Sequence, residues 1–262
     1  MKIATWNVNS VRKRAGNLTA FLKRVKPDVV VLQELKAQDD QFPHEAAHEA
    51  GYKSEVFGQK GFNGVAMIST HAIDNIQRGL PGDDADTQSR YIEGRIKTPA
   101  GPLTVAGIYL PNGNPIGTEK FAYKLAWMKR LEARAKALLA KGEMFVLAGD
   151  YNVCPTDMDV YDPRLFAKDA LCQPESRAAY RRLLNLGLTD AVRAFHPDDT
   201  RWTYWDYTAG AWQKDNGLRI DHILLSPQAA DRLRNVDIEK SERGKPEPSD
   251  HVPVWCELDV GD

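Results

Sequence analysis

Cysteine is scarce in this sequence, and its few residues form no recognisable framework. Cys154, Cys172 and Cys256 include no Cys-x-x-Cys pair and leave one thiol over in any pairing. Such a set supports neither a disulfide-stabilised secreted fold nor a structural zinc site. We expect the three side chains to be free thiols, because an unpaired cysteine usually packs as a small apolar residue.

A long hydrophobic run is also lacking. No apolar segment approaches the roughly 18 residues that a membrane span requires, and the opening MKIATWNVNS contains no apolar core of the signal-peptide kind. Hydrophobic residues make up 42% of the chain and charged residues 27%, which argues against a disordered or fibrous protein. We therefore expect a cytoplasmic protein that does not associate with membranes.

Neither sign of charge is in excess. The 35 basic residues nearly balance the 36 acidic ones, for a net charge of −1, so the composition gives no general indication of nucleic-acid binding. A polyanionic partner would have to be met by a local basic patch. Internal repeats and linker-like segments are absent as well, so we expect residues 1–262 to form a single domain.

Short apolar runs alternate with longer helical patterns, as in an α/β fold. The run DVVVLQE is apolar almost throughout, which is typical of a strand covered on both faces. KIATWNVNS alternates instead, so that Ile3 and Asn7 share one face of a strand. The spacing of apolar residues predicts three helices, over 11–25, 119–141 and 175–186.

Polar side chains of chemical interest stand where six of the apolar runs begin or end. They are Asn7, Glu34, Tyr109, Asn112, Asp150, Asn152, Asp221, Asp250 and His251. Each alone has a simpler explanation, as a helix cap, a solvated loop acid or a turn residue. Together they indicate a functional site, because strand ends and the loops beyond them are where α/β proteins place reactive groups.

The chemistry of these groups favours phosphoester hydrolysis. Asp221 stands within an apolar run, where an unpaired charge is costly. His251 is a suitable partner, because a carboxylate fixes the tautomer and the position of an imidazole. Glu34, Asp150 and Asp250 then remain as oxygen ligands for a hard cation such as Mg²⁺ or Mn²⁺, which would neutralise a phosphate while a base orients water. No P-loop, serine or cysteine nucleophile motif, or HExxH motif points to another reaction.

Seven short motifs carry a family resemblance. In chain order they are ATWNVNS, LQELK, GFNGVA, IYLPNG, GDYNVCP, LRIDHILLS and SDHVPV. Over essentially the whole chain, this order resembles that of the exonuclease III type of apurinic/apyrimidinic (AP) endonucleases, within the endonuclease/exonuclease/phosphatase superfamily. GDYN and SDHVP occur across that superfamily, whereas LQELK, DVYDP and GLRID narrow the resemblance to its DNA repair branch. The resemblance implies a four-layered α/β sandwich, two mixed β-sheets packed face to face with helices on the outside, and a Mg²⁺-dependent phosphodiesterase acting on DNA.

The same resemblance implies a metal site. Glu34 would be the principal ligand of one or two Mg²⁺ ions, for which Mn²⁺ could substitute. Asn7 and Asp250 would complete or surround the site.

It also implies a reaction centre. Asp150, helped by Asn152, would align or deprotonate the attacking water. His251, held by Asp221, would contact the scissile phosphate, and Tyr109 would support the phosphate or the leaving oxygen. Whether Asp150 or His251 is the base stays open at the level of the sequence.

Two further groups would contact DNA. The resemblance implies a small apolar pocket that accepts a flipped abasic sugar and excludes a normal nucleotide, and its residues would be Tyr204, Trp205, Leu218 and Ile220. Plain core packing is the alternative for these side chains. We expect contacts to backbone phosphates, and hence salt-dependent binding, from Arg12, Lys13, Arg14, Lys36 and Asn112.

The leading hypothesis is a monomeric enzyme that acts on double-stranded DNA with abasic sites or blocked 3′ ends. It would cut 5′ to an abasic lesion, leave a 3′-hydroxyl and have some 3′-phosphodiesterase or 3′→5′ exonuclease activity. One alternative is a superfamily phosphatase that acts on a phosphorylated lipid or inositol. Another is a catalytically silent DNA-binding module, which metal-dependent turnover would exclude.

Overall fold

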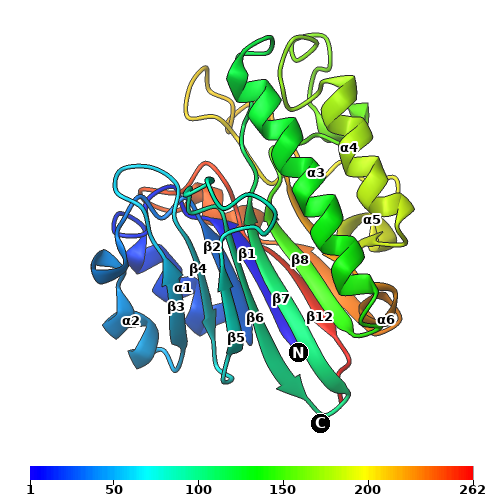
Figure 1. Cartoon of the computed structure of the whole chain (residues 1–262). Helices are drawn as coiled ribbons and strands as arrows, with labels where there is room; N and C mark the ends of the chain where they lie inside the picture. Colours follow the sequence, from blue (N-terminus) through cyan, green and yellow to red (C-terminus); the bar gives the residue numbers. More distant parts are fainter. Residues whose placement is uncertain (262) are drawn as a thin grey trace.

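Two six-stranded β-sheets form the centre of the molecule (Figure 1). The computed structural model describes residues 1–261. In spatial order, the first sheet contains β11 (Leu233–Ile238), β12 (Val254–Leu258), β1 (Lys2–Asn7), β2 (Val29–Gln33), β4 (Val65–Ser69) and β3 (Lys53–Phe57). The second contains β5 (Asp74–Arg78), β6 (Tyr91–Thr98), β7 (Gly101–Tyr109), β8 (Met144–Asp150), β10 (Asp221–Leu225) and β9 (Thr189–Asp190). β1 runs parallel to β2 and β7 parallel to β8, whereas the other pairs are antiparallel, so both sheets are mixed.

Helices cover the outer face of each sheet. On the first sheet, buried side chains of α1 (Ala15–Val25) and α2 (His44–Glu49) pack against β1, β2 and β4. On the second, α3 (Glu119–Leu139) and α4 (Pro174–Asn185) pack against β7 and β8. Two short helices, α5 (Ala191–Phe195) and α6 (Pro227–Ala230), lie beside β10. The predicted four-layered sandwich is confirmed, and within residues 1–261 no helix combines the length and apolarity that crossing a bilayer would require.

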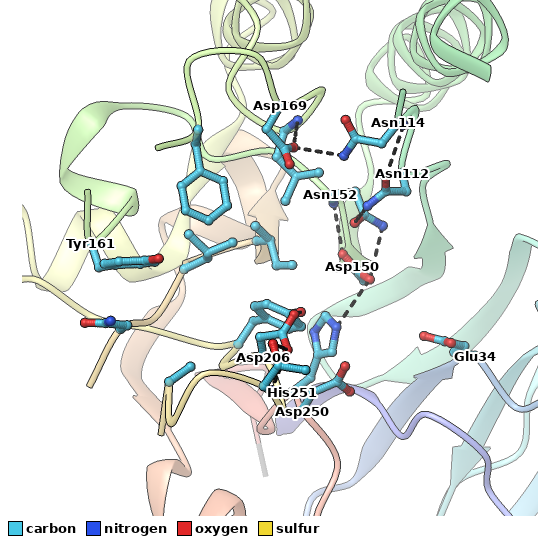
Figure 2. Close-up of a pocket in the computed structure, with 18 of the residues that line it drawn as sticks. Glu34, Asn112, Asn114, Asp150, Asn152, Tyr161, Asp169, Asp206, Asp250 and His251 are labelled. Carbon is cyan, nitrogen blue, oxygen red and sulfur yellow. Dashed lines mark hydrogen bonds and ion pairs between the residues drawn. The ribbon is translucent and has the colours of Figure 1, made fainter. Parts of the chain in front are cut away.

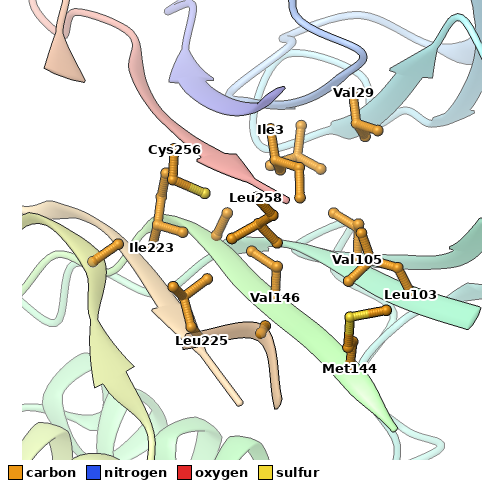
Figure 3. Close-up of a cluster of buried hydrophobic side chains, with 14 of the residues drawn as sticks. Ile3, Val29, Leu103, Val105, Met144, Val146, Ile223, Leu225, Cys256 and Leu258 are labelled. Carbon is orange, nitrogen blue, oxygen red and sulfur yellow. The ribbon is translucent and has the colours of Figure 1, made fainter. Parts of the chain in front are cut away.

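The main core lies between the two sheets (Figure 3). Ile3 and Val31 of the first sheet meet Val105, Val146 and Ile223 of the second, and all five are fully buried. The alternation read from KIATWNVNS is the reason for one half of this contact. Ile3 enters the inter-sheet core, whereas its neighbours Ala4 and Trp6 join the cluster under α1, because successive side chains of a strand point to opposite faces.

Gly107 of β7 allows the sheets to approach closely. A Cβ at this position would lie 2.9 Å from Val31 Cβ on the opposing sheet. We expect Gly107→Ala to lower the free energy of unfolding by about 1–3 kcal/mol, the usual cost of overpacking a core, as measured by urea denaturation. Gly16→Ala is the matched control, because a Cβ on Gly16 in α1 meets nothing within 4 Å. The control should be neutral or slightly stabilising, and equal behaviour of the two variants would contradict the expectation.

The first helix begins later than its sequence pattern predicts. The predicted helix over 11–25 is wrong at its start, since residues 11–14 form a turn and α1 begins at Ala15. Asn9 and Ser10 have positive φ values of 42° and 85°, and the Ser10 N–H donates to the carbonyl of Glu34 beyond β2. The chain therefore ties itself to the neighbouring strand end before it can enter a helix. The helices predicted over 119–141 and 175–186 agree with α3 and α4 to within two residues.

Candidate active site

The two parallel strand pairs bring their carboxyl ends together at one edge of the sandwich. Asn7 of β1 is paired in register with Gln33 of β2, next to Glu34, and Tyr109 of β7 is paired with Asp150 of β8. A cavity of about 420 Å³ opens at this edge (Figure 2). The predicted site residues that line it are Glu34, Tyr109, Asn112, Asp150, Asn152, Tyr204, Leu218, Ile220, Asp250 and His251. Asn7 and Asp221 are buried directly behind this wall, each hydrogen-bonded to residues that line it.

The predicted His–Asp couple is formed. His251 Nδ1 lies 2.8 Å from Asp221 Oδ2 and 3.1 Å from Oδ1, and both side chains are buried. The hydroxyl of Thr203 donates to Asp221 Oδ2 over 2.6 Å and so fixes the carboxylate from the other side. Burial by itself lowers the pKa of His251, but the adjacent charges of Asp221 and Asp150 outweigh it and raise the pKa to about 10. At neutral pH this side chain is therefore an imidazolium.

Asp150 sits on the opposite side of the imidazole. Its Oδ2 is 3.8 Å from His251 Nε2, and it accepts hydrogen bonds from the Asn7 amide and from both the backbone and the side chain of Asn152. Burial raises the pKa of Asp150 to about 7, while His251 pulls it down and the nearby charge of Asp221 pushes it up. A carboxyl group with a pKa near the working pH is suited to accept a proton from water.

Oxygen donors suited to a cation gather beside Asp150. A single nitrogen, Asn7 Nδ2, lies 3.0 Å from Glu34 Oε2 and 3.0 Å from Asp150 Oδ2, so these two carboxylates face the same small space. Lys36 Nζ is 2.9 Å from Glu34 Oε1 and 2.7 Å from the side-chain oxygen of Asn9. The Asn9 amide in turn donates to Asp250 Oδ1 over 3.0 Å. Carboxylate and amide oxygens brought together in this way fit the hard-ligand preference of Mg²⁺ or Mn²⁺.

A second grouping offers ligand atoms but is committed to its own pairing. One potential ligand atom from each of Asp150, Asp221 and His251 lies within 4.8 Å of the others. Because His251 Nδ1 and Asp221 are already joined by a hydrogen bond, a cation bound there would have to displace an ion pair. The oxygen donors on the Glu34 side carry no such histidine pairing, and they are the better candidates for a metal site.

Amide and phenol groups line the opposite wall. Asn112 Nδ2 donates to Asn152 Oδ1 over 3.1 Å, and Asn152 Nδ2 donates to the carbonyl of Leu110. Burial, followed by the charges of Glu34 and Asp150, raises the pKa of Tyr109 well above its usual value. The Tyr109 hydroxyl therefore keeps its proton and can donate a hydrogen bond to an anion in the cavity.

An apolar wall occupies the far side of the cavity. Tyr204, Leu218 and Ile220 line it as predicted, together with Phe166 and Leu171, which sequence reasoning missed. Leu218 and Ile220 face the cavity because they are two residues apart in an extended segment, with Arg219 pointing the other way into a buried ion pair with Asp159.

Trp205 does not belong to this wall, so its prediction as a pocket residue was wrong. Its ring is fully buried against Trp212, and its Nε1 donates to Asp215. The reason is local. Tyr204 forms bridges to both Leu218 and His251, so the chain is extended here and adjacent side chains diverge.

The predicted DNA contacts divide into accessible and inaccessible groups. Arg12 and Lys13 are exposed on the turn after β1, and Lys36 is partly exposed beside Glu34. Arg14 is only 6% exposed. Its Nη2 donates to the Tyr207 hydroxyl and to the carbonyl of Pro248. The prediction that Arg14 contacts backbone phosphates is therefore wrong, since its guanidinium is used to tie the loop before Asp250 to the end of β1.

Sequence reasoning missed several polar residues that build the site. Asn9 links Asp250 to Lys36, and it could have been found because it belongs to the same NVNS motif as Asn7. Thr203 carried no indication, because its role depends on lying beside Asp221, 18 residues away. Asn114 and Asp169 both line the cavity and are joined by a 3.0 Å hydrogen bond. They too are far apart in the sequence.

The fold and the site define a hydrolase of the phosphoesterase class: a four-layered sandwich whose sheet edge holds a histidine–aspartate couple, a neutral-range carboxyl group and a cluster of oxygen donors. The family model described as "Endonuclease/Exonuclease/phosphatase family" matches residues 4–251. The chain belongs to this family, and the resemblance inferred from the seven motifs is confirmed.

Individual relatives agree with this placement along the whole chain. Exodeoxyribonuclease III of Haemophilus influenzae is 35% identical over 98% of this chain and 100% of its own length. Among solved structures, an AP endonuclease from Archaeoglobus fulgidus is 35% identical, with a TM-score of 0.93 over 99% of this chain and 100% of that one. The 3′ phosphatase NExo from Neisseria, bound to a product DNA hairpin, is 37% identical, with a TM-score of 0.95 over 99% of both chains. The protein is accordingly an enzyme, a nuclease-type hydrolase.

Proposed function

We propose that this protein is a Mg²⁺-dependent DNA repair phosphodiesterase. It cuts the backbone 5′ to an abasic site to leave a 3′-hydroxyl, and it removes blocking groups or nucleotides from 3′ ends. The observation that carries the proposal is the position of the Asp150–His251–Asp221 group, which lies between a cluster of oxygen donors and an apolar pocket wall. The names of the relatives, an exodeoxyribonuclease III, an AP endonuclease and a 3′ phosphatase bound to a DNA hairpin, support DNA as the substrate.

Asp150 is assigned as the base and His251 as a phosphate-binding cation. The raised pKa of Asp150, about 7, matches proton transfer from water near neutral pH, whereas a pKa of about 10 keeps the His251 imidazole protonated and unable to accept that proton. Asn152 holds Asp150 through two hydrogen bonds, and Asp221 holds His251.

In the proposed reaction a water oxygen attacks phosphorus and its proton passes to Asp150. The bond from phosphorus to the 3′ oxygen of the preceding nucleotide breaks, and that oxygen leaves to become the 3′-hydroxyl. His251, the Tyr109 hydroxyl and the Asn112 amide donate hydrogen bonds to the phosphate or to the leaving oxygen, where negative charge grows.

Glu34, Asp250 and the side-chain oxygen of Asn7 would hold one or two Mg²⁺ ions, which Mn²⁺ could replace. Bound there, the ion would supply positive charge close to the phosphate and the leaving oxygen. Lys36 already places one positive charge against Glu34, so it is expected to shift toward the DNA backbone when a divalent ion binds. Arg12 and Lys13 on the exposed turn would contact the same backbone.

The apolar wall explains why an abasic sugar is the favoured substrate. Tyr204, Leu218, Ile220, Phe166 and Leu171 offer a surface that a deoxyribose without its base can contact once it is flipped out of the helix. A sugar that carries a base would have to place that base against the same wall. Extruding an unpaired site also costs less than breaking a base pair.

The deciding experiment uses a duplex oligonucleotide with one stable abasic analogue, incubated with the purified protein plus Mg²⁺ or plus chelator, with both product ends identified. A single cut 5′ to the lesion that leaves a 3′-hydroxyl and disappears with chelator supports the proposal. Intact duplex in both conditions would refute it and would favour a phosphorylated lipid or inositol as substrate. Duplex that is bound but never cut would favour a silent DNA-binding module.

Glu34→Gln tests the metal assignment. We expect it to raise the Mg²⁺ concentration that gives half-maximal cleavage by about tenfold or more, because a carboxylate ligand is lost. The measurement is a Mg²⁺ titration of the initial rate on the abasic duplex. Glu55→Gln is the control, since Glu55 lies on β3 and is paired with Arg78. An unchanged Mg²⁺ requirement in Glu34→Gln would remove Glu34 from the metal site.

We further propose that residues 1–262 act as one catalytic domain, in the cytoplasm and as a monomer. Cys154, Cys172 and Cys256 are free thiols, which fits a reducing compartment. Size-exclusion chromatography with light scattering would test the monomer, and a dimer of constant mass across concentrations would refute it.

A further inference from the structure

Lys124 of α3 is a charged side chain completely enclosed by the protein. Its exposed fraction is 0%, and it is among the largest fully buried side chains of the chain. Lysine is almost never buried to this extent unless it is paired. Its position on a helix that otherwise covers the second sheet with Trp127, Met128 and Leu131 makes a charge there costly.

The Lys124 ammonium joins two loops that carry site residues. Nζ donates to the carbonyl of Asn112 over 3.0 Å and to the carbonyl of Asn152. Asn112 follows β7 and Asn152 follows β8, and their side chains are joined by the 3.1 Å hydrogen bond at the cavity wall. One buried cation thus sets the spacing of both backbones behind an amide pair that faces the substrate.

The packing around the lysine stem leaves little freedom. A Cβ on Gly113, whose φ is +88°, would lie 2.6 Å from Lys124 Cδ and 3.3 Å from Ala170 Cβ. The loop between Asn112 and Asn114 therefore rests directly on the aliphatic part of the lysine. Both the stem and the ammonium of Lys124 contact the same loop.

We propose that Lys124 is a positioning residue of the reaction, which holds Asn112 and Asn152 at the spacing that the phosphate requires. The inference rests on the proposed phosphodiesterase function. A methionine would fill the same volume without a buried charge, and replacing buried charges by apolar groups is often neutral or stabilising. Retaining a lysine at that cost is understandable when the two carbonyls must be held by one group with several donors. Burial lowers the pKa of Lys124 to about 7, with the charges of Asp150 and Asp169 acting in the opposite direction.

The first test is Lys124→Met, compared with Lys129→Met, an exposed lysine on the same helix. On the abasic duplex we expect Lys124→Met to lower kcat by about ten- to a hundredfold per folded enzyme, with KM within about twofold of the wild type, because the amides contact the phosphate most strongly in the transition state. Lys129→Met should equal the wild type. The folded fraction is measured by circular dichroism and thermal melting at the assay temperature. If Lys124→Met does not fold, Lys124→Gln, which keeps an amide donor, takes its place with the same readouts.

A double-mutant cycle with Asn112→Ala separates positioning from a general structural role. If Lys124 acts through the amide pair, the double variant should lose at least about tenfold less than the product of the two single losses. Losses that simply multiply, or an unchanged kcat in the folded Lys124→Met variant, would overturn the inference. The wild type is assayed in parallel, so absence of cleavage by the wild type would refute the proposed function instead.

Discussion

Asp150→Asn is expected to lower kcat on an abasic duplex by about a thousandfold or more, with DNA binding preserved. The substitution keeps the shape of the side chain and removes the group that accepts the proton of the attacking water. Single-turnover cleavage measures the chemical step, and fluorescence anisotropy in chelator measures binding. Because the pKa of Asp150 is raised to about 7, its carboxylate form increases as the pH rises through neutrality. The wild-type rate should therefore rise with pH over that range, and the residual rate of the variant should not.

Asp259→Asn is the control for this experiment. Asp259 is exposed near the end of the chain and paired with Arg234. Its replacement should leave both kcat and the pH profile unchanged. Retention of more than about a tenth of the wild-type rate by Asp150→Asn would assign the base elsewhere, with His251 the next candidate.

Asp221→Asn is expected to lower kcat by about a hundred- to ten-thousandfold, again with DNA binding nearly intact. Asp221 is the first-named charge that raises the pKa of His251 against the effect of burial. Without it the imidazole loses its proton at a lower pH. In the wild type the charge of His251 is present below pH 10 and is lost above it, so any alkaline fall in activity should move toward neutral pH in the variant.

Nuclear magnetic resonance provides the direct measurement. The carbon-bound ring protons of His251 report its titration, and their midpoint should fall in Asp221→Asn and stay high in Asp259→Asn. Equal turnover in the wild type and Asp221→Asn would contradict the role of the couple. An unchanged midpoint with reduced turnover would show that Asp221 acts by orienting the ring and not by charging it.

The central strands could be predicted because their patterns depend on short-range physics. Buried strands must be apolar on the faces they cover, so DVVVLQE and KIATWNVNS reveal β2 and β1 without knowledge of their partners. Edge strands are different. β5 is mostly exposed, so its sequence carries no clear apolar period, and only pairing with β6 defines it. The start of α1 was mispredicted for the same reason, since the turn at 11–14 is decided by a hydrogen bond to the carbonyl of Glu34.

The sequence by itself determined the set of reactive groups and the fact that they stand at strand ends, because residue type and local periodicity are written in the order of the chain. Only the tertiary structure decided which of them meet. His251 lies 30 residues from Asp221 and Asn7 lies 143 residues from Asp150, and their contacts exist because the two sheets pack face to face with their parallel strand pairs ending at one edge. The same packing turned Trp205 and Arg14 away from the substrate and buried Lys124 behind the amide pair. Burial and neighbouring charge, which set the protonation of Asp150 and His251, are properties of that arrangement and not of any one residue.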